Sequence, residues 1–185
     1  MNRDIYHEYL QVLDHAECLF SAERVAQAVA DLGRAVSIDF ADRNPLVLCV
    51  MTGGLRFCSD LLGHLNFPLE LDYVHLSRYR DRTEGGELNW LRHPVDGLRG
   101  RHLLVVDDIL DRGITLASVR EHCTEAGALS VATAVLVDKQ LPQRVVDSEY
   151  AAIHAPDRYL FGEGMDFKGY GRNLRGIYAI ADQHL

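Results

Sequence analysis

Three aspartates lie within five positions of the segment LLVVDDILDRGITL, residues 103–116, at Asp107, Asp108 and Asp111. Four apolar residues lead directly into the first pair, which is typical of a buried strand that ends in charged residues. Like charges placed side by side repel one another and are costly to remove from water. The segment therefore predicts a ligand that is positively charged or rich in hydroxyl groups.

The residues after the acids are suited to holding a phosphate group. Gly113 to Thr115 lie where the expected strand gives way to a helix, so free N–H groups and the positive end of the helix dipole point outward. Asp107 and Asp108 beside them can bind ribose hydroxyls directly or through a divalent cation. The pattern indicates a sugar-phosphate site. Alternatively the acids only cap the helix in solvent, but one cap needs one aspartate and not three.

The elements that must position these residues follow a repeated order of strand, glycine turn and helix. Ser21 and the apolar spacing after it predict a helix over residues 21–41. Further helices are expected at 55–65 and 114–128, and strands at 46–51, 69–79, 103–108, 130–139, 157–161 and 176–181. This order implies an α/β fold with a mostly parallel central sheet flanked by helices. Ligands bind at the carboxyl ends of such strands, where we expect TGG (52–54), DDILDRGIT (107–115) and VDK (137–139).

The composition limits the class of protein. A chain of 185 residues suits one domain, 1–185, with a sizeable core. Its net charge of −8 argues against a nucleic-acid surface, which needs a basic stripe, although a local pocket can still bind an anion. No segment reaches the roughly 18 apolar residues of a membrane span, and the N-terminus lacks the apolar core of a signal peptide. With four scattered cysteines, this predicts a cytoplasmic protein that binds neither nucleic acid nor membrane.

The segment VVDDILDRGIT resembles the signature with which type I phosphoribosyltransferases bind PRPP (5-phosphoribosyl 1-pyrophosphate). That signature has several apolar residues, two acids, two apolar residues, Asp, a small residue, Gly, any residue and Thr. Arg112 stands where Thr is usual and Ile114 where Lys is common, but both positions present mainly backbone in the family. The resemblance implies a 5′-phosphate site at Arg112, Gly113, Ile114 and Thr115, with the ribose hydroxyls on Asp107 and Asp108.

Four other segments resemble the hypoxanthine-guanine branch of the family: VMTGGLRFCSDL, LDYVHLSRY, AVLVDK and PDRYLFGEGMDFKGYGRNLRGIYAI. The likeness covers roughly residues 20–180. It implies a type I phosphoribosyltransferase fold with a small hood, formed by N-terminal residues and about 155–185, and a mobile lid at about 78–95. It also implies a purine salvage enzyme that joins a 6-oxopurine base to PRPP and releases pyrophosphate.

On the base side, the resemblance assigns Asp111 as the catalytic acid or base at N7 of the purine, and Lys139 as the donor to O6. An ammonium group only donates, whereas adenine offers an amino group at that position, so Lys139 favours 6-oxopurines. Tyr159 matches an aromatic residue that stacks on the base. The purine edge would meet Leu160 and Asp166.

On the pyrophosphate side, the resemblance implies contacts from Thr52, Gly53 and Arg172, with Tyr79 as an aromatic residue of the lid. Mg²⁺ is the implied cofactor. Its implied ligands are three acids: Asp107, Asp108 and Asp166.

Two departures from the family pattern affect the expected charge of this site. Thr52 stands where Lys is common, which removes a cation, and Arg78 stands where many relatives have Ser. Our hypothesis is that Arg78 restores the lost positive charge to the pyrophosphate site. Arg144 is a second candidate for that contact. The polar segment 81–93 fits either a mobile lid or an ordinary surface β-ribbon, and Trp90 within it fits either a lid anchor or a core residue.

The main alternative is a regulatory protein that senses PRPP or nucleotides on the same fold without transferring anything. A sensor has no need of an acid at Asp111, so the acid together with Lys139 and Tyr159 favours an enzyme. A transferase for adenine or a pyrimidine is a third interpretation, disfavoured by Lys139 and the hood. The pattern does not rank hypoxanthine, guanine and xanthine, and the family tends to form homodimers and homotetramers.

Overall fold

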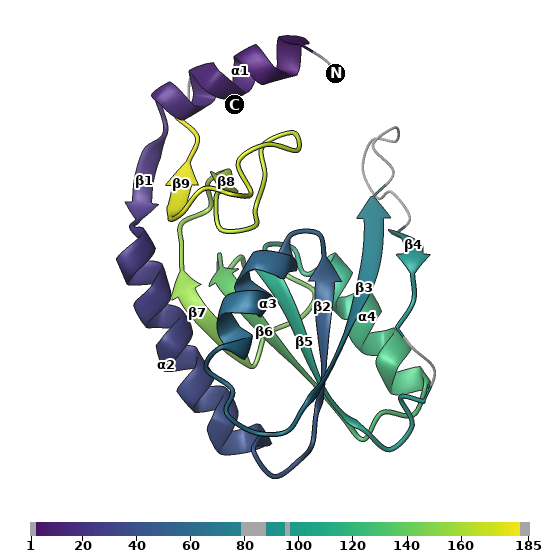
Figure 1. Ribbon diagram of the computed structural model, residues 1–185. Helices are drawn as coiled ribbons and strands as arrows, with labels where there is room; N and C mark the ends of the chain where they lie inside the picture. The colour runs from purple at the N-terminus through teal and green to yellow at the C-terminus, as the bar shows by residue number, and fades with distance from the viewer. Residues whose placement is uncertain (1–2, 79–87, 95–96, 182–185) are drawn as a thin grey trace.

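The computed structural model describes residues 3–78, 88–94 and 97–181, and its larger sheet has six strands (Figure 1). Across this sheet the strands follow in the order β4 (Leu88–Arg92), β3 (Glu70–Arg78), β2 (Leu46–Met51), β5 (His102–Leu110), β6 (Ser130–Asp138) and β7 (Tyr150–His154). All neighbours are parallel except the pair β3 and β4. The expected α/β fold with a mostly parallel sheet is confirmed.

Helices cover both faces of this sheet. One face packs against α2 (Ala22–Phe40) and α3 (Gly54–Leu62), and the other against α4 (Ile114–Glu125). Within β2, Val47 and Cys49 pack in the core on the side of α2 and α3. Leu46, Leu48 and Val50 pack in the core on the side of α4. An uninterrupted apolar run is therefore needed in this strand, because both of its faces are buried.

A second, antiparallel sheet joins the two ends of the chain. Its strands lie in the order β1 (Glu17–Phe20), β9 (Ile177–Ala179) and β8 (Leu160–Phe161). The N-terminal helix α1 (Arg3–Asp14) packs on this sheet through Tyr9 and Val12 in a small separate core. This unit lies above the carboxyl ends of the large sheet in Figure 1 and is the expected hood.

The helix predicted at 21–41 is α2. Its N-terminal cap and its stripe of apolar residues explain why it forms. The Ser21 side chain accepts a hydrogen bond from the Arg24 N–H at 3.4 Å. The five apolar residues at three- and four-residue spacing are all buried: Val25, Val29, Leu32, Val36 and Phe40. No helix among the described residues is long and apolar enough to cross a membrane.

Some elements differ from the sequence-based expectation. The strand expected at 103–108 continues to Leu110, and α1, β1 and β7 had not been predicted. The helix expected at 55–65 has Leu55 at helical spacing with Cys58, Leu61, Leu62 and Leu65, but Leu55 is 50% exposed. Of the segment 81–93, residues 81–87 lie outside the described chain, while 88–92 form β4. Trp90 packs partly buried against the core on the α4 side and stacks on His93 at 4.6 Å between ring centroids.

Candidate active site

A cavity of about 640 Å³ opens where the carboxyl ends of β2, β3, β5 and β6 meet the hood. Its lining brings together segments that are far apart in sequence, as the parallel sheet predicts. Most of the residues proposed from the sequence line it: Thr52, Gly53, Asp107, Asp108, Asp111, Gly113, Ile114, Thr115, Lys139, Tyr159, Leu160, Asp166 and Arg172.

The start of α4 forms one wall of the cavity. Gly113 precedes the helix with φ +77°, and a Cβ there would lie 2.8 Å from a methyl carbon of Val146. Only glycine fits both the backbone conformation and the space. Gly113 gives no side-chain cap, so the N–H groups of the first turn remain available to an anion near Ile114 and Thr115. Arg112 is exposed and does not line the cavity, although its carbonyl accepts from the Val145 N–H.

Asp107 and Asp108 lie at the end of β5, against the same wall. Asp107 is only 7% exposed, and its carboxylate accepts a hydrogen bond from the Asp108 N–H at 2.9 Å. Burial raises the pKa of Asp107 well above its ordinary value, and the neighbouring charge of Asp108 raises it further. Burial also raises the pKa of Asp108, against the opposing effects of Asp107 hydrogen bonding and the positive charge of Arg172. The ionised pair is therefore unfavourable until hydroxyl donors or a cation meet it.

The loop between β2 and α3 lies directly against these acids. A Cβ on Gly53 would come 2.0 Å from Oδ2 of Asp108, and one on Gly54 would come 2.8 Å from the Val106 carbonyl oxygen. The peptide between Met51 and Thr52 is cis. The two glycines of TGG are thus required by the close approach of the loop to β5.

The base side of the cavity is organised around Lys139, which follows β6. Its side chain is 9% exposed, and its Nζ lies 3.5 Å from Oδ2 of Asp111 and 3.3 Å from Oδ1 of Asp157. Buried Asp138 fixes the turn after the strand, since its carboxylate accepts from the Gln140 N–H at 2.7 Å. The ammonium group is therefore held next to the proposed catalytic acid. Asp157 was not predicted as a partner of Lys139.

Arg144 is committed to holding the same turn. Its Nη1 lies 3.1 Å from Oδ1 of Asp138, and its Nη2 lies 2.5 Å from Oδ1 of Asp147. It does not line the cavity. Its contacts connect it to the Lys139 turn and not to the pyrophosphate loop.

Hood residues close the cavity from above. The Tyr159 hydroxyl donates to the backbone oxygen of Asp166 at 3.1 Å, and its ring meets Phe167 edge-on with centroids 5.9 Å apart. The Tyr159 side chain is 42% exposed, so its ring is accessible at the cavity. Leu160 and Met165 supply an apolar surface beside it. This combination suits a planar heteroaromatic ring.

Arg172 faces the acids from the hood. Its Nη1 donates to the Gly164 carbonyl at 2.6 Å, and its Nη2 pairs with Oδ1 of Asp166 at 2.5 Å. The second oxygen of Asp166 accepts from the Gly169 N–H at 2.6 Å. Asp166 is therefore bound to Arg172 and to its own turn.

The carboxyl end of β3 adds cavity residues that had not been proposed: His75, Leu76 and Ser77. These residues could have been proposed from the expected sheet, because β3 lies parallel to β2 and parallel strands end at the same edge. Arg78 is the last residue of β3, and its backbone pairs with Leu88. The Arg78 side chain and all of Tyr79 lie outside the described residues, so both remain predictions.

Comparison with known proteins identifies the family. A model of the phosphoribosyl transferase domain matches residues 15–166. The chain belongs to the phosphoribosyltransferase family. This phosphoribosyltransferase is 34% identical over 174 residues to the hypoxanthine-guanine phosphoribosyltransferase of Streptococcus thermophilus, covering 92% of the chain and 96% of that relative. It is 31% identical over 163 residues to the hypoxanthine-guanine-xanthine phosphoribosyltransferase of Tritrichomonas foetus, covering 87% and 89%.

Solved structures of related phosphoribosyltransferases agree with the fold. A hypoxanthine phosphoribosyltransferase from Staphylococcus aureus matches with a TM-score of 0.83 at 26% identity, over 90% of this chain and 92% of that one. The Trypanosoma cruzi hypoxanthine phosphoribosyltransferase, solved in complex with its product IMP, matches with a TM-score of 0.83 at 27% identity. That match covers 91% of this chain and 96% of the other. The expected type I phosphoribosyltransferase fold is confirmed.

Proposed function

We propose that this phosphoribosyltransferase is a purine salvage enzyme that joins a 6-oxopurine base to PRPP and releases pyrophosphate. Hypoxanthine, guanine and xanthine are the candidate bases, which would give IMP, GMP or the xanthine nucleotide. The observation that carries this is the pairing of Lys139 with Asp111 in the same cavity as the helix start at Gly113. The relatives from Tritrichomonas foetus and Streptococcus thermophilus, which are named for these bases, support the same substrate class.

The reaction forms a bond from a purine nitrogen to C1 of PRPP as the bond from C1 to the pyrophosphate oxygen breaks. Asp111 would hold or move the proton at N7 of the purine, and Lys139 would donate to O6. Lys139 lies 3.5 Å from Asp111, so one base can meet both groups. Tyr159 would stack on the ring, and positive charge that develops on the ribose would be tolerated by Asp107 and Asp108.

The pyrophosphate would lie between the loop at Thr52 and Gly53 and the guanidinium of Arg172, all of which line the cavity. Arg78 would add a second cation from the end of β3, in place of the lysine that Thr52 lacks. The lid that begins there, with Tyr79, would exclude the water that otherwise hydrolyses PRPP.

Mg²⁺, when bound, would offset the charge of the leaving pyrophosphate. The donors fit this ion, because Mg²⁺ takes one or two protein carboxylates and completes its shell with water and substrate phosphate oxygens. Asp107 and Asp108 supply two carboxylates whose pKa values are both raised by burial, and the charge of Asp108 raises the pKa of Asp107 further. Asp166 lines the same cavity but is bound by Arg172. Among the described residues, no group of three or more His, Cys, Asp and Glu side chains is gathered for a metal ion.

One experiment separates the enzyme from a PRPP sensor. The protein is incubated with PRPP, Mg²⁺ and each of hypoxanthine, guanine, xanthine and adenine in turn, and nucleotide formation is followed by chromatography. We expect nucleotide from at least one 6-oxopurine and little from adenine. Tight PRPP binding with no nucleotide from any base would overturn the enzyme and favour the sensor.

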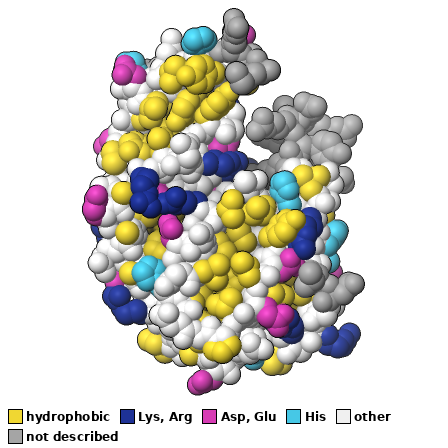
Figure 2. All heavy atoms as spheres, viewed as in Figure 1, with side chains coloured by type: hydrophobic (Ala, Val, Ile, Leu, Met, Phe, Trp, Pro, Cys, Tyr) yellow, Lys and Arg dark blue, Asp and Glu magenta, His cyan; other side chains and the backbone are white. Residues whose placement is uncertain are grey.

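We also propose a homodimer or homotetramer in the cytoplasm, with no nucleic-acid or membrane partner. On the face shown in Figure 2, hydrophobic side chains gather beside α3. Exposed apolar residues include Leu55 of α3 at 50%, and Leu71 and Tyr73 of β3 at 56% and 42%. Apolar side chains gathered on the surface of a folded chain are typical of an interface. Sedimentation equilibrium should therefore give at least twice the mass of 20.8 kDa, and a monomer at micromolar concentration would contradict the assembly.

A further inference from the structure

Glu163 is a buried acid to which the reaction scheme gives no role. Its side chain is 5% exposed, in a turn between Gly162 and Gly164 where all three residues have positive φ. Oε1 accepts a hydrogen bond from the Gly176 N–H at 2.8 Å, and Oε2 lies 3.2 Å from Nε of Arg56. The carboxylate therefore has one partner in the hood and one outside it.

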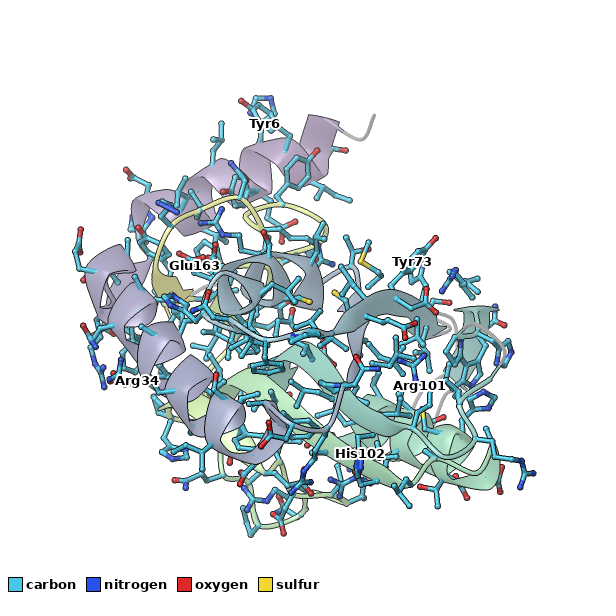
Figure 3. The ribbon with its side chains drawn as sticks, turned by 60° about the horizontal axis from the view of Figure 1, so that its bottom comes forward. Tyr6, Arg34, Tyr73, Arg101, His102 and Glu163 are labelled. Carbon is cyan, nitrogen blue, oxygen red and sulfur yellow. The ribbon has the colours of Figure 1, made fainter. Side chains whose placement is uncertain are left out.

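Arg56 belongs to α3, the helix that begins directly after the pyrophosphate loop. The turn that carries Glu163 also meets that loop through its backbone, since a Cβ on Gly164 would lie 2.2 Å from the Gly53 carbonyl oxygen. An ion pair and a backbone contact thus join the same hood turn to the same loop and helix. Figure 3 shows Glu163 where the hood overlies α3.

This turn also holds Arg172. The Gly164 N–H donates to the Arg172 carbonyl at 3.0 Å, and the Gly164 carbonyl accepts from Nη1 of Arg172 at 2.6 Å. The Glu163 N–H donates to the Leu174 carbonyl at 3.0 Å. A displacement of this turn would therefore move both the backbone and the guanidinium of Arg172.

We propose that Glu163 is a positioning residue that locks the hood turn to α3, so that Arg172 and Gly53 hold the pyrophosphate group of PRPP in fixed register. This rests on the proposed function, since it concerns the same site. Glu163 is buried while the Arg56 side chain is 32% exposed, and the desolvation of a buried charge offsets much of the attraction within such an ion pair. The location of this pair between two substrate-facing segments gives it a use that stability alone does not.

The chain offers variants that isolate this contact. Glu163→Gln keeps an oxygen that can accept from Gly176 but places an amide N–H against the Arg56 donor. Removal of Arg56 alone would leave a buried unpaired carboxylate and threaten folding, so Arg56→Gln is made only together with Glu163→Gln. Asp60→Asn is the matched control, because Asp60 is the other partner of Arg56, at 3.2 Å, and its side chain is 43% exposed.

PRPP affinity is measured by calorimetry with Mg²⁺ for the full chain and each variant, with melting temperatures and steady-state constants alongside. A misplaced binding group contacts PRPP less well. We therefore expect the Kd and KM for PRPP to rise about tenfold in both Glu163→Gln chains. The KM for the base should change less than about threefold, because Leu160 keeps its pairing with Ala179 of β9 and the Tyr159 carbonyl keeps its hydrogen bond from the Ile180 N–H. Asp60→Asn should match the wild type.

A merely structural role would lower the melting temperature of the Glu163→Gln chains and leave the Kd for PRPP unchanged, which would overturn the proposal. Equal rises in the KM for PRPP and for the base, or the same rise in Asp60→Asn, would also overturn it. If the wild type binds PRPP but forms no nucleotide, the proposed function fails while the calorimetric comparison still tests Glu163. Absence of PRPP binding by the wild type would overturn both.

Discussion

The carboxyl ends of the parallel strands (the sheet edge) and the hood line the same cavity, but their residues come from very different spans of the sequence. At the sheet edge, the acids and the helix start come from one run, residues 107–115. In the hood, β9 pairs with β8 on one side and with β1 on the other, so Ala179 lies opposite both Leu160 and Glu17. Groups at the sheet edge are therefore placed by local strand-to-helix geometry, whereas hood groups depend on contacts between distant segments. Changes at the edge should remove chemistry, and changes in the hood should shift positions.

The largest effect is expected at the sheet edge, at Asp111. Asp111→Asn keeps the size of the side chain but removes the group that takes or gives the proton at N7. We expect kcat to fall about 10²- to 10⁴-fold, as is usual when general acid–base catalysis is lost. The Kd for PRPP should stay close to that of the wild type, measured by calorimetry. A variant that retains more than about a tenth of wild-type kcat would show that Asp111 is not the catalytic acid or base.

Lys139 comes next, because it tests recognition of the base and not the transfer step. Lys139→Gln replaces a pure donor with an amide that can also accept, so we expect kcat/KM for hypoxanthine to fall about 10- to 100-fold and adenine to be rejected less strongly. Competition between the two bases measures this. Asp157→Asn is the matched control: it removes the other partner of Lys139, and since Asp157 is 68% exposed, the change should cost less than about threefold. An unchanged preference for hypoxanthine over adenine in Lys139→Gln would show that another group selects the base.

The same contrast decides how much could be predicted from the sequence. Asp107, Asp108 and Gly113 could be placed because an apolar strand, a glycine turn and a helix leave few geometries. Asp157 and Glu163 could not, since their partners Lys139 and Arg56 become neighbours only through the tertiary fold. A charged residue in a glycine turn gives no signal of its own in a single sequence.

The spacing of apolar residues along a helix also gave a wrong prediction at one position, where a local contact overrides it. Leu55 fits the apolar stripe of α3, yet it faces solvent while Gly54 is buried against the end of β5. The close approach of Gly54 to the Val106 carbonyl fixes the rotation of the first turn of α3. A periodic pattern indicates which face of a helix is apolar but not how a tight loop turns its first residues.

Arg78 tests whether the sheet edge contains a replacement cation. If Arg78 supplies the charge that Thr52 lacks, Arg78→Ala should raise the KM for PRPP about tenfold, since one charge-assisted contact to pyrophosphate is lost. The KM for the base should rise much less. Initial rates with each substrate varied in turn measure both constants. Equal effects on the two would contradict the assignment and place Arg78 in general closure of the site.

The smallest expected effect is on the stability of the ligand-free protein. Its sign tests whether the acids of the sheet edge cost stability. Burial and the charge of Asp108 raise the pKa of Asp107 in the folded chain above the ordinary 3.8. The folded state then holds this proton more tightly than the unfolded state, so the ligand-free protein loses stability as pH rises from about 3.8 through the raised pKa.

Asp107→Asn removes this ionisation and keeps an oxygen for the Asp108 N–H. At pH 7 the ligand-free variant should therefore be more stable than the wild type, by on the order of 1 kcal/mol, and near pH 4 the difference should vanish. Urea unfolding of the wild type and the variant at both pH values measures this.

With PRPP and Mg²⁺ present, the order at pH 7 should reverse, because the substrate hydroxyls and the cation then stabilise the ionised pair in the wild type only. A variant that is less stable without ligand at pH 7 would mean that the acids already offset the cost of their own burial. The acids of the sheet edge would then contribute to stability as well as to binding. The sheet edge and the hood would differ only in where their residues come from in the sequence.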